Sequence, residues 1–231
     1  MTIEEAWGKV LSELNAASKN PGHAFRYLSL ATVDAKDQPS QRMVVLRKFS
    51  QHNRFTIYTD ARSGKVEDLI DNNSVSLLFY DHDQKLQVTV KGSAKVLSDG
   101  EGNLNHWTES GSKGTHSYTS VKSPGEVIQK PDEAYEWNLE DSEHFCVIHI
   151  ESHSMEFLQL DGHRHLRSFR ELSSNGSWKE RQKEKPDEKS SSLKELNLIC
   201  HYCRCAGGEV ASTAENVSKI LYVCSASLGT K

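Results

Sequence analysis

The sequence Arg42-Met-Val-Val-Leu-Arg47, followed by Phe55-Thr-Ile-Tyr58, decides the predicted fold. Both segments are short and rich in β-branched, aromatic and other apolar residues, and the polar residues Ser50-Gln-His-Asn53 separate them. Two such runs joined by a polar turn are typical of a β-hairpin. We therefore expect a hairpin with Arg42 and Arg47 at the two ends of its first strand.

The sequence after the hairpin, Tyr58-Thr-Asp-Ala-Arg-Ser-Gly-Lys65, leads into the amphipathic segment Lys65-Val-Glu-Asp-Leu-Ile70. A phosphate dianion is bound well where guanidinium groups, an ammonium, a hydroxyl and free helix N-terminal amides converge. We predict such a phosphate site here, formed by Arg42, Arg47, Ser63 and Lys65. The alternative is that these are solvated cations at strand ends.

Composition excludes several classes of protein. The 231 residues can bury a substantial core in roughly one to two domains. The net charge of −4 gives no electrostatic argument for a nucleic-acid partner or an anionic membrane. No apolar run approaches the roughly 20 residues of a membrane span, and the N-terminus lacks the pattern of a secretory signal. We therefore expect a cytoplasmic protein that binds neither nucleic acid nor membrane.

The five cysteines are odd in number and unevenly placed, which does not resemble a disulfide framework. Cys146 lies in an apolar run, so we expect a buried thiol. Cys200, Cys203 and Cys205, together with His201, have spacings that could form a tetrahedral zinc site. A second paired knuckle is missing, and structural zinc sites need four ligands. We therefore predict no bound metal, with zinc at this cluster as the alternative.

Hydrophobic periodicity predicts an N-terminal helix over residues 3–14, with Thr2 as N-cap and Glu5 in capping-box position. Many short strands with turns between them follow, which favours a mainly β antiparallel barrel or sandwich with flanking helices. Besides the hairpin, the expected strands are residues 27–33, 74–80, 86–90, 145–150 and 155–160.

Two further segments are polar. The polar composition of residues 103–125 predicts a partly helical insertion between two strands that ends in a loop. Residues 179–192 are charged and rich in serine, which is typical of a linker. We expect one domain over residues 1–182, followed by a linker and a poorly ordered extension over 183–231; the alternative for the tail is a small interaction module.

A series of motifs also occurs in a definite order along the chain. These are Leu30-Ala-Thr-Val-Asp34, Gln38-Pro-Ser-Gln-Arg42, Tyr58-Thr-Asp-Ala-Arg-Ser-Gly-Lys65, Gln87-Val-Thr-Val-Lys-Gly92, Met155-Glu-Phe-Leu-Gln-Leu160, His163-Arg-His-Leu-Arg167 and Trp178. The ordered set, which covers about residues 5 to 186, resembles the pyridoxamine 5'-phosphate oxidase family. The resemblance implies an antiparallel FMN-binding split β-barrel that works as a homodimer, with flavin sites at the subunit interface.

The resemblance also implies which residues bind FMN. Residues 42–46 match the strand that lies along the flavin, mostly through its backbone, and Gln87 matches the glutamine that contacts the isoalloxazine system. A late cofactor arginine of the family aligns with Ser168, which leaves Arg167 as a displaced substitute. The implied cofactor-binding residues are Arg42, Met43, Val44, Val45, Leu46, Arg47, Tyr58, Thr59, Ser63, Lys65, Gln87 and Arg167.

The chemistry implied by the resemblance is oxidation of the C4' amine or alcohol of a phosphorylated B6 vitamer by FMN, with oxygen as acceptor. Arg164 aligns with the arginine that the family places over the substrate. His165 is the second catalytic candidate, although the order here is Arg-His-Leu where the family has Arg-Leu-His, and a one-residue shift on a strand reverses the face of a side chain. The alternative for both is a charged residue in an exposed turn.

The sequence departs from the family pattern where the substrate would bind. The family clamps the substrate phosphate with a Tyr, Arg and Ser set, whereas residues 103–125 contain Tyr118 but no arginine. Lys113 could replace the arginine only as a point charge. Leu158 stands where the family often places a tryptophan beside the flavin. The implied substrate-binding residues are Arg47, Lys113, Tyr118 and Arg164.

We therefore predict an FMN-dependent oxidase that acts on a phosphorylated B6 vitamer or a similar small molecule. The departures support FMN binding more strongly than oxidase activity. A flavin-binding carrier or sensor of the same fold is the alternative. A barrel without flavin, serving as an interaction module, is the third possibility if the cations prove to be dispersed in space.

Overall fold

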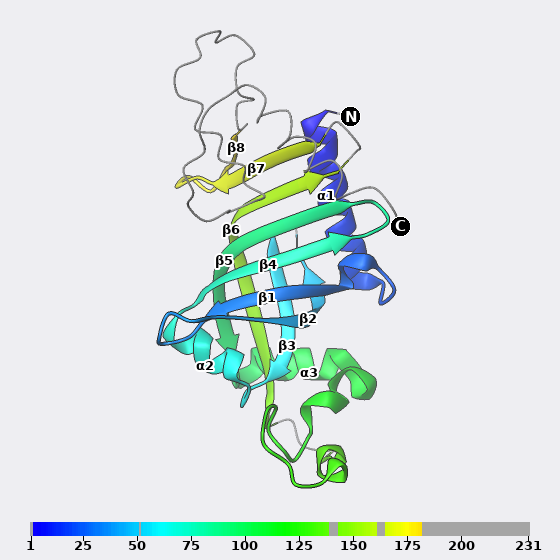
Figure 1. Ribbon diagram of the computed structural model, residues 1–231, viewed down its shortest axis with the longest axis vertical. Coiled ribbons are helices and arrows are strands. Elements are labelled where there is room, and N and C mark those ends of the chain that lie inside the picture. Colours follow the sequence, from blue (N-terminus) through cyan, green and yellow to red (C-terminus); the bar gives the residue numbers. More distant parts are fainter. Residues whose placement is uncertain (1, 51, 139–142, 161–164, 182–231) are drawn as a thin grey trace, which may run out of the picture. The chain divides into compact units, whose positions relative to one another are not determined.

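The computed structural model describes residues 2–50, 52–138, 143–160 and 165–181. Figure 1 shows their arrangement. The elements in chain order are α1 (Ile3–Lys19), η1 (Ala24–Arg26), β1 (Tyr27–Val33), β2 (Pro39–Phe49), β3 (Arg54–Asp60), α2 (Gly64–Asp71), β4 (Ser74–Asp81), β5 (Leu86–Leu97), α3 (Gly100–Thr115), η2 (His116–Tyr118), η3 (Pro131–Tyr135), β6 (Phe145–Gln159), β7 (Leu166–Leu172) and β8 (Trp178–Arg181).

The strands form a closed antiparallel barrel. Their order in the sheet is β3-β2-β1-β4-β5-β6-β7-β8, and β3 also pairs with β6, so that six strands close on themselves. Strands β7 and β8 extend the sheet beyond β6. Closure matters because it leaves the six barrel strands without a free edge. The predicted antiparallel barrel is therefore confirmed.

The pairing of β5 with β6 contains a bulge at His153 of β6, because Lys91 pairs with Ser154 and the next residue, Gly92, pairs with Ser152. A Cβ atom at Gly92 would lie 2.4 Å from the carbonyl oxygen of Glu151, so only glycine permits this approach of the two backbones. A bulge of this kind bends a strand and increases its twist. The bend lets the 12 residues of β5 follow the 15 residues of β6 along most of their length.

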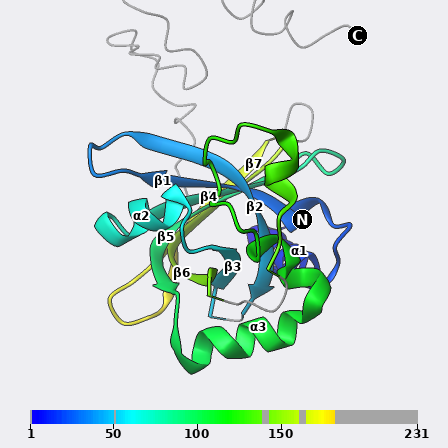
Figure 2. The same cartoon turned by 90° about the horizontal axis from the view of Figure 1, so that it is seen from below.

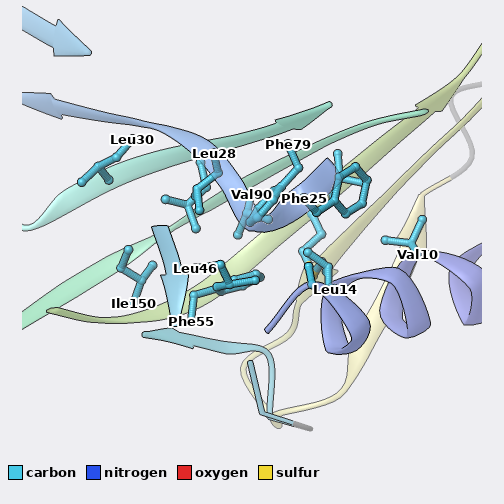
Figure 3. Packing of buried hydrophobic residues seen from close by; sticks show 14 of the residues in the cluster. Val10, Leu14, Phe25, Leu28, Leu30, Leu46, Phe55, Phe79, Val90 and Ile150 are labelled. Carbon is cyan, nitrogen blue, oxygen red and sulfur yellow. The ribbon is translucent and has the colours of Figure 1, made fainter. Parts of the chain in front are cut away.

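The core fills the inside of the barrel. Figure 3 shows apolar side chains from the strands and from η1 meeting those of α1. The ring centroids of Phe25 and Phe79 lie 5.5 Å apart, and those of Phe55 and Phe79 lie 5.8 Å apart. Helix α1 contributes Val10 and Leu14, both buried. Because alternate residues of each strand face inward, the inward apolar side chains form one cluster with those of α1.

Helix α1 begins as the sequence predicts. The Thr2 hydroxyl accepts a hydrogen bond from the Glu5 amide at 3.2 Å, and the Thr2 amide donates to the Glu5 carboxylate at 2.7 Å. An N-cap of this kind stabilises a helix by about 1 kcal/mol. The helix continues to Lys19, five residues beyond the predicted end at residue 14, because Ala17 is also buried against the core.

Helix α3 covers the outer face of the barrel. Figure 2 shows it running across the ends of β3 and β6. Here Tyr58, Phe145 and Val147 form a second small apolar cluster, against which Trp107 and Tyr118 pack. The residues predicted as a partly helical excursion thus form α3 and η2, with a kink at Gly111, whose φ is 63°. This packing fixes the position of Tyr118, one of the predicted substrate-binding residues.

Two strands were not predicted. Strands β7 and β8 contain charged residues at most outward positions, and β7 pairs with β6 over residues 154–159. None of the helices within the described ranges is long and apolar enough to cross a membrane. The predicted linker, the extension over residues 183–231 and the cysteine cluster lie outside the described residues, so the expected domain boundary stays a prediction.

Candidate functional site

A group of polar and charged side chains gathers where β1, β2 and β3 meet α2. Arg42 Nη1 donates to the Thr32 hydroxyl at 2.6 Å, and that hydroxyl donates to the Asp68 carboxylate at 2.5 Å. Arg42 Nη2 lies 3.4 Å from the same Asp68 oxygen. Helix α2 thus holds the Arg42 guanidinium in place through Asp68, and Thr32 is buried beneath it.

Lys65 reaches the same group from the first turn of α2. Its Nζ atom donates to the Thr59 hydroxyl at 2.9 Å, and the Thr59 and Ser63 hydroxyls lie 3.2 Å apart. The Ser63 hydroxyl donates to the Asp60 carbonyl at 2.7 Å. Ser63 is the N-cap residue of α2, but its side chain makes no capping hydrogen bond to the helix. Two hydroxyls therefore lie beside the ammonium at the N-terminus of a helix.

The environment of Lys65 is electrostatically unfavourable for a cation. Burial lowers the pKa of Lys65, and the neighbouring Arg42 guanidinium lowers this pKa further. Asp60 and Asp68 oppose this lowering in part, and the Arg62 guanidinium holds the Asp60 carboxylate through contacts of 2.7 and 3.0 Å. An anion placed between Arg42 and Lys65 would relieve the repulsion. We call Arg42, Thr59, Ser63 and Lys65 the α2 cluster.

The donor set of the α2 cluster fits a phosphate monoester. It offers one guanidinium, one ammonium, two hydroxyls and the N-terminal amides of a helix, which are the groups that bind phosphate oxygens well. Its composition therefore suits the phosphate of FMN. Sequence reasoning found all four residues but missed Thr32 and Asp68, which orient Arg42. Asp68 lies three residues after Lys65, the spacing that places two side chains on one helix face, and this was the available signal.

Arg47 does not join the α2 cluster. It lies at the irregularity between Leu46 and Lys48 where the register of β2 against β3 shifts, on the side covered by α3. Its guanidinium carbon lies 5.4 Å from the centre of the Tyr58 ring, and Nη2 donates to the Tyr118 hydroxyl at 3.3 Å. Arg47 Nε is buried and has no hydrogen-bond partner. An unsatisfied buried donor costs about 1–3 kcal/mol, so its presence points to an absent acceptor.

Tyr58 and Tyr118 connect Arg47 to the outer face of the barrel. The Tyr118 hydroxyl donates to the Tyr58 carbonyl at 3.2 Å, and the Tyr58 hydroxyl lies 3.1 Å from His106 Nδ1 on α3. Burial lowers the pKa of His106, and the nearby Lys48 lowers it further. The structure thus brings together Arg47, Tyr58 and Tyr118, which we call the α3 cluster.

Between the two clusters, β2 presents a mixed surface. Met43 is 65% exposed, Val44 and Val45 are half-buried, and Leu46 lies in the core. On strand β5, which β1 and β4 separate from β2 in the sheet, Gln87 is half-buried and its amide lies 3.5 Å from the Thr89 hydroxyl. The backbone and side chains predicted to lie along a flavin are therefore accessible in part, except that of Leu46.

Exposed apolar side chains lie on the same sheet surface. Ser29 on β1 is opposite Met43 on one side and Leu78 on the other, so these side chains are neighbours. Tyr27 and Tyr80 are 60% and 46% exposed. Contiguous exposed apolar residues on a sheet commonly mark an interaction surface. We call Tyr27, Met43, Leu78 and Tyr80 the apolar face.

The remaining predicted residues are dispersed. Arg167 is about half exposed and forms an ion pair with Glu156. Ser168 is buried, accepts a hydrogen bond from Trp7 Nε1 at 3.0 Å and donates to Glu180, so it links α1 to β7 and β8. His165 is exposed just before β7. Arg164 and the side chain of Lys113 lie outside what the structure describes, and their roles stay predictions.

The cysteine that the structure describes is structural. Cys146 is buried and unpaired, as predicted, and burial raises the pKa of its thiol to about 11. A thiol with so high a pKa is a poor nucleophile or metal ligand at neutral pH. Within the described ranges, no group of three or more histidine, cysteine or acidic residues could hold a metal ion.

Sequence comparison identifies relatives of the chain. Residues 4–98 match the family model described as "Pyridoxamine 5'-phosphate oxidase, FMN-binding domain". A pyridoxine/pyridoxamine 5'-phosphate oxidase from Teredinibacter turnerae is 32% identical over 162 residues, which cover 65% of this chain and 75% of that protein. The corresponding protein of Shewanella pealeana is 37% identical over 101 residues. That match covers 44% of each protein, so the chain spans less than half the length of this relative.

Solved structures agree on the fold. A pyridoxamine 5'-phosphate oxidase-related, FMN-binding protein from Nostoc punctiforme has a TM-score of 0.66 at 21% identity, covering 76% of this chain and 95% of that one. PhzG from Burkholderia lata, in complex with tetrahydrophenazine-1-carboxylic acid, has a TM-score of 0.62 at 20% identity, covering 77% and 91%. The match to the Teredinibacter turnerae relative, together with the family match over the strands that carry the α2 cluster, shows that the chain belongs to the pyridoxamine 5'-phosphate oxidase family and contains its FMN-binding domain.

Proposed function

We propose that the protein is an FMN-dependent oxidase that converts the C4' amine or alcohol of a phosphorylated B6 vitamer to the aldehyde. The names of its relatives support this substrate class. Bound FMN supplies the two-electron acceptor, which molecular oxygen regenerates with release of hydrogen peroxide. An alcohol substrate then gives aldehyde and peroxide, whereas an amine substrate also consumes water and releases ammonia.

The observation that carries the proposal is the α2 cluster. Arg42 and Lys65 are adjacent, partly buried cations, and the Thr59 and Ser63 hydroxyls lie beside them. These residues would hold the FMN phosphate through charge-assisted hydrogen bonds. Residues 43–46 would lie along the flavin, and Gln87 would contact its ring system, as the family resemblance implies. Anchoring the phosphate fixes the position of the reacting ring relative to the substrate.

The substrate would lie toward the α3 cluster. Arg47 and Tyr118 contact each other there and offer a guanidinium and a hydroxyl to a substrate phosphate. Arg164 would orient the substrate over the flavin, with His165 as its companion, and Arg167 would assist in holding the cofactor. Lys113 would contribute a point charge. In these roles the protein binds and orients both reactants, and the flavin carries the electrons.

We propose that the protein works as a homodimer. Its apolar face carries exposed aromatic and methionine side chains on three adjacent strands, which water solvates poorly. A second copy is the natural occupant, because a stable interface buries about 800 Å² per partner and dimers of identical chains use the same patch twice. Sedimentation should show a dimer for the native chain and a monomer for Met43→Lys. Dimerisation of both at equal strength would contradict this surface.

Absorbance and mass analysis of the purified chain test the cofactor first. We expect FMN to copurify and to be lost in Arg42→Ala, while Lys36→Ala, which removes an exposed cation in the turn after β1, retains it. Peroxide release with pyridoxine 5'-phosphate or pyridoxamine 5'-phosphate then tests the oxidase activity. A flavin-loaded protein that releases no peroxide with either compound would contradict the proposed reaction.

One observation favours a second function. Residues 103–125 contain no arginine, so the described part of α3 brings no guanidinium to the α3 cluster. This favours a flavin-binding protein without oxidase activity, such as a carrier or sensor. Tight FMN binding together with absent turnover would support it, whereas turnover of a B6 vitamer would exclude it.

A further inference from the structure

A small cavity lies between the end of η1, strand β2 and helix α3. Its volume is about 270 Å³, and its lining residues are Arg26, Arg47, Lys48, Tyr58, Glu109 and Ser110. Pockets for drug-sized ligands run from roughly 300 to 1,000 Å³, so this cavity suits one small group better than a whole flavin. Three of its six lining residues are cations, which points to an anion.

The charges in the cavity do not cancel. Lys48 forms an ion pair with Glu109, which leaves the guanidinium groups of Arg26 and Arg47 without an acidic partner among the lining residues. Burial lowers the pKa of Arg26, and the neighbouring Arg47 lowers it further, so the two guanidinium groups repel each other. Two adjacent positive charges in a partly buried cavity match the charge of a phosphate monoester dianion.

The hydrogen bonds of the two arginines support the same conclusion. Arg26 Nη1 donates to the Ser18 carbonyl at 2.9 Å and the Ala17 carbonyl at 3.3 Å, at the C-terminal end of α1. These contacts fix the guanidinium from one side. Arg47 Nε is buried without a partner, and its Nη2 contact with Tyr118 is long at 3.3 Å. The cavity therefore has two oriented guanidinium groups and a buried donor that lacks an acceptor.

We propose that Arg26 is a further residue that binds the substrate phosphate, and that it supplies a second guanidinium beside Arg47, which the proposed function already places at that phosphate. The proposal rests on the proposed function for the identity of the substrate. Two converging guanidinium forks bind a phosphate more specifically than one, because each can donate two parallel hydrogen bonds. Arg26 comes from the segment before β1, far from α3 in sequence, and only the fold brings it to the cavity.

The test uses the full chain in its FMN-loaded form, with pyridoxal 5'-phosphate and unphosphorylated pyridoxal as probes. Arg26→Gln should weaken binding of pyridoxal 5'-phosphate by about tenfold or more, the effect of one lost charge-assisted hydrogen bond, and leave pyridoxal binding unchanged. Arg54→Gln is the matched control, because Arg54 pairs with the exposed Glu151 and is not among the residues that line the cavity. It should bind both probes as the native chain does.

Two results would overturn the proposal. The first is an affinity of Arg26→Gln for pyridoxal 5'-phosphate within about twofold of the native value. The second is loss of FMN from Arg26→Gln with unchanged affinity for the phosphorylated probe, since the cavity would then serve the cofactor. If Arg26→Gln fails to fold because α1 loses its contacts, Arg26→Lys retains the charge without the fork, and native affinity in that variant would equally overturn the proposal.

The anion site in the cavity can be tested even if the proposed oxidase function is wrong. If the native chain oxidises no B6 vitamer, titration with inorganic phosphate still tests the cavity. The native chain should then bind phosphate, and Arg26→Gln and Arg47→Gln should each weaken that binding by about tenfold. Phosphate binding that neither substitution alters, or no phosphate binding by the native chain, would overturn the anion site itself.

Discussion

Strand β2 carries two arginines, one toward each of its ends, in contrasting environments. Arg42 is held by Thr32 and Asp68 in a polar network, whereas Arg47 lies over the Tyr58 ring with a buried Nε that lacks an acceptor. Five residues of strand separate them by about 16 Å. The first site is prepared by neighbouring charges that hold its donors in place. The second site contains a buried donor, Arg47 Nε, that has no acceptor, and a ligand bound there would provide one.

The largest expected effect concerns the α2 cluster. Lys65→Ala or Arg42→Ala should weaken FMN binding by about 10- to 100-fold, because each removes a charge-assisted hydrogen bond of about 1.5–3 kcal/mol. Arg47→Ala should change FMN binding much less if the two ends of β2 serve different ligands. Fluorescence titration of the flavin-free protein with FMN measures all three. Equal losses of FMN affinity in the three variants would mean that Arg47 binds the same ligand as Arg42 and Lys65.

The two histidines beside the α3 cluster, His106 and His149, should make the folded protein sensitive to acid. Burial lowers the pKa of both His106 and His149, whose rings lie 5.3 Å apart. Their folded-state pKa values lie below the unfolded values, so the unfolded chain takes up more protons and stability is lost as pH falls below about 6.5.

This acid sensitivity can be assigned by mutation. Urea unfolding at several pH values should show the loss, and His106→Gln should reduce it. Glu109, Lys48, Arg54 and Glu151 are the other charged groups that influence the pair. A stability of His106→Gln that falls with pH as steeply as that of the native chain would contradict the assignment.

FMN binding at the α2 cluster should be sensitive to alkaline pH. The pKa of Lys65 is lowered by burial and by Arg42, and Asp60, Cys146 and Asp68 oppose this shift only in part. As pH rises through the folded-state pKa, the ammonium loses its proton and FMN binding should weaken. The flavin-free protein should instead gain stability over the same interval, because the unfolded chain retains the proton longer.

The matching variant for this prediction is Lys65→Met. It keeps much of the apolar stem and removes the titrating group, so both pH dependences should become shallower. Unfolding curves and FMN titrations between neutral and alkaline pH would show this. Unchanged slopes in the variant would mean that another group titrates.

The smallest expected effect is that of Tyr118→Phe. The hydroxyl accepts from Arg47 and donates to the Tyr58 carbonyl, so its removal should lower the free energy of unfolding by about 0.5–1.5 kcal/mol. Urea unfolding measures this, and FMN binding should stay native. A loss of FMN binding in this variant would mean that the site around Arg47 and the α2 cluster are not independent.

Local signals in the sequence predicted the parts of the fold that depend on neighbouring residues. The Thr2–Glu5 capping box and the hairpin turn, in which the Asn53 amide donates to the Ser50 carbonyl, lie within a few residues of chain. The α2 cluster was also predictable, because Thr59, Ser63 and Lys65 are close in sequence and Arg42 precedes them on the paired strand.

Long-range contacts were not predictable in this way. The sequence analysis grouped Arg47 with Arg42, although residues five apart on a strand point to opposite faces. The contacts of Arg47 with Tyr58 and Tyr118 depend on segments distant in sequence. Arg26 reaches the α3 side through the path of η1, and Asp68 orients Arg42 through the packing of α2. Strand β7 was not predicted, because its buried residue Ser168 is polar and the hydrogen-bond partner of Ser168, Trp7, lies 161 residues away in sequence.

The most direct test of the account is quantification of bound flavin in the purified native chain beside Arg42→Ala, Lys65→Ala and the control Lys36→Ala. We predict FMN in the native chain and in the control, and its loss from the two α2-cluster variants. A native chain without flavin that also binds no added FMN, or equal FMN content in all four proteins, would contradict the claim that Arg42 and Lys65 hold the phosphate of the cofactor.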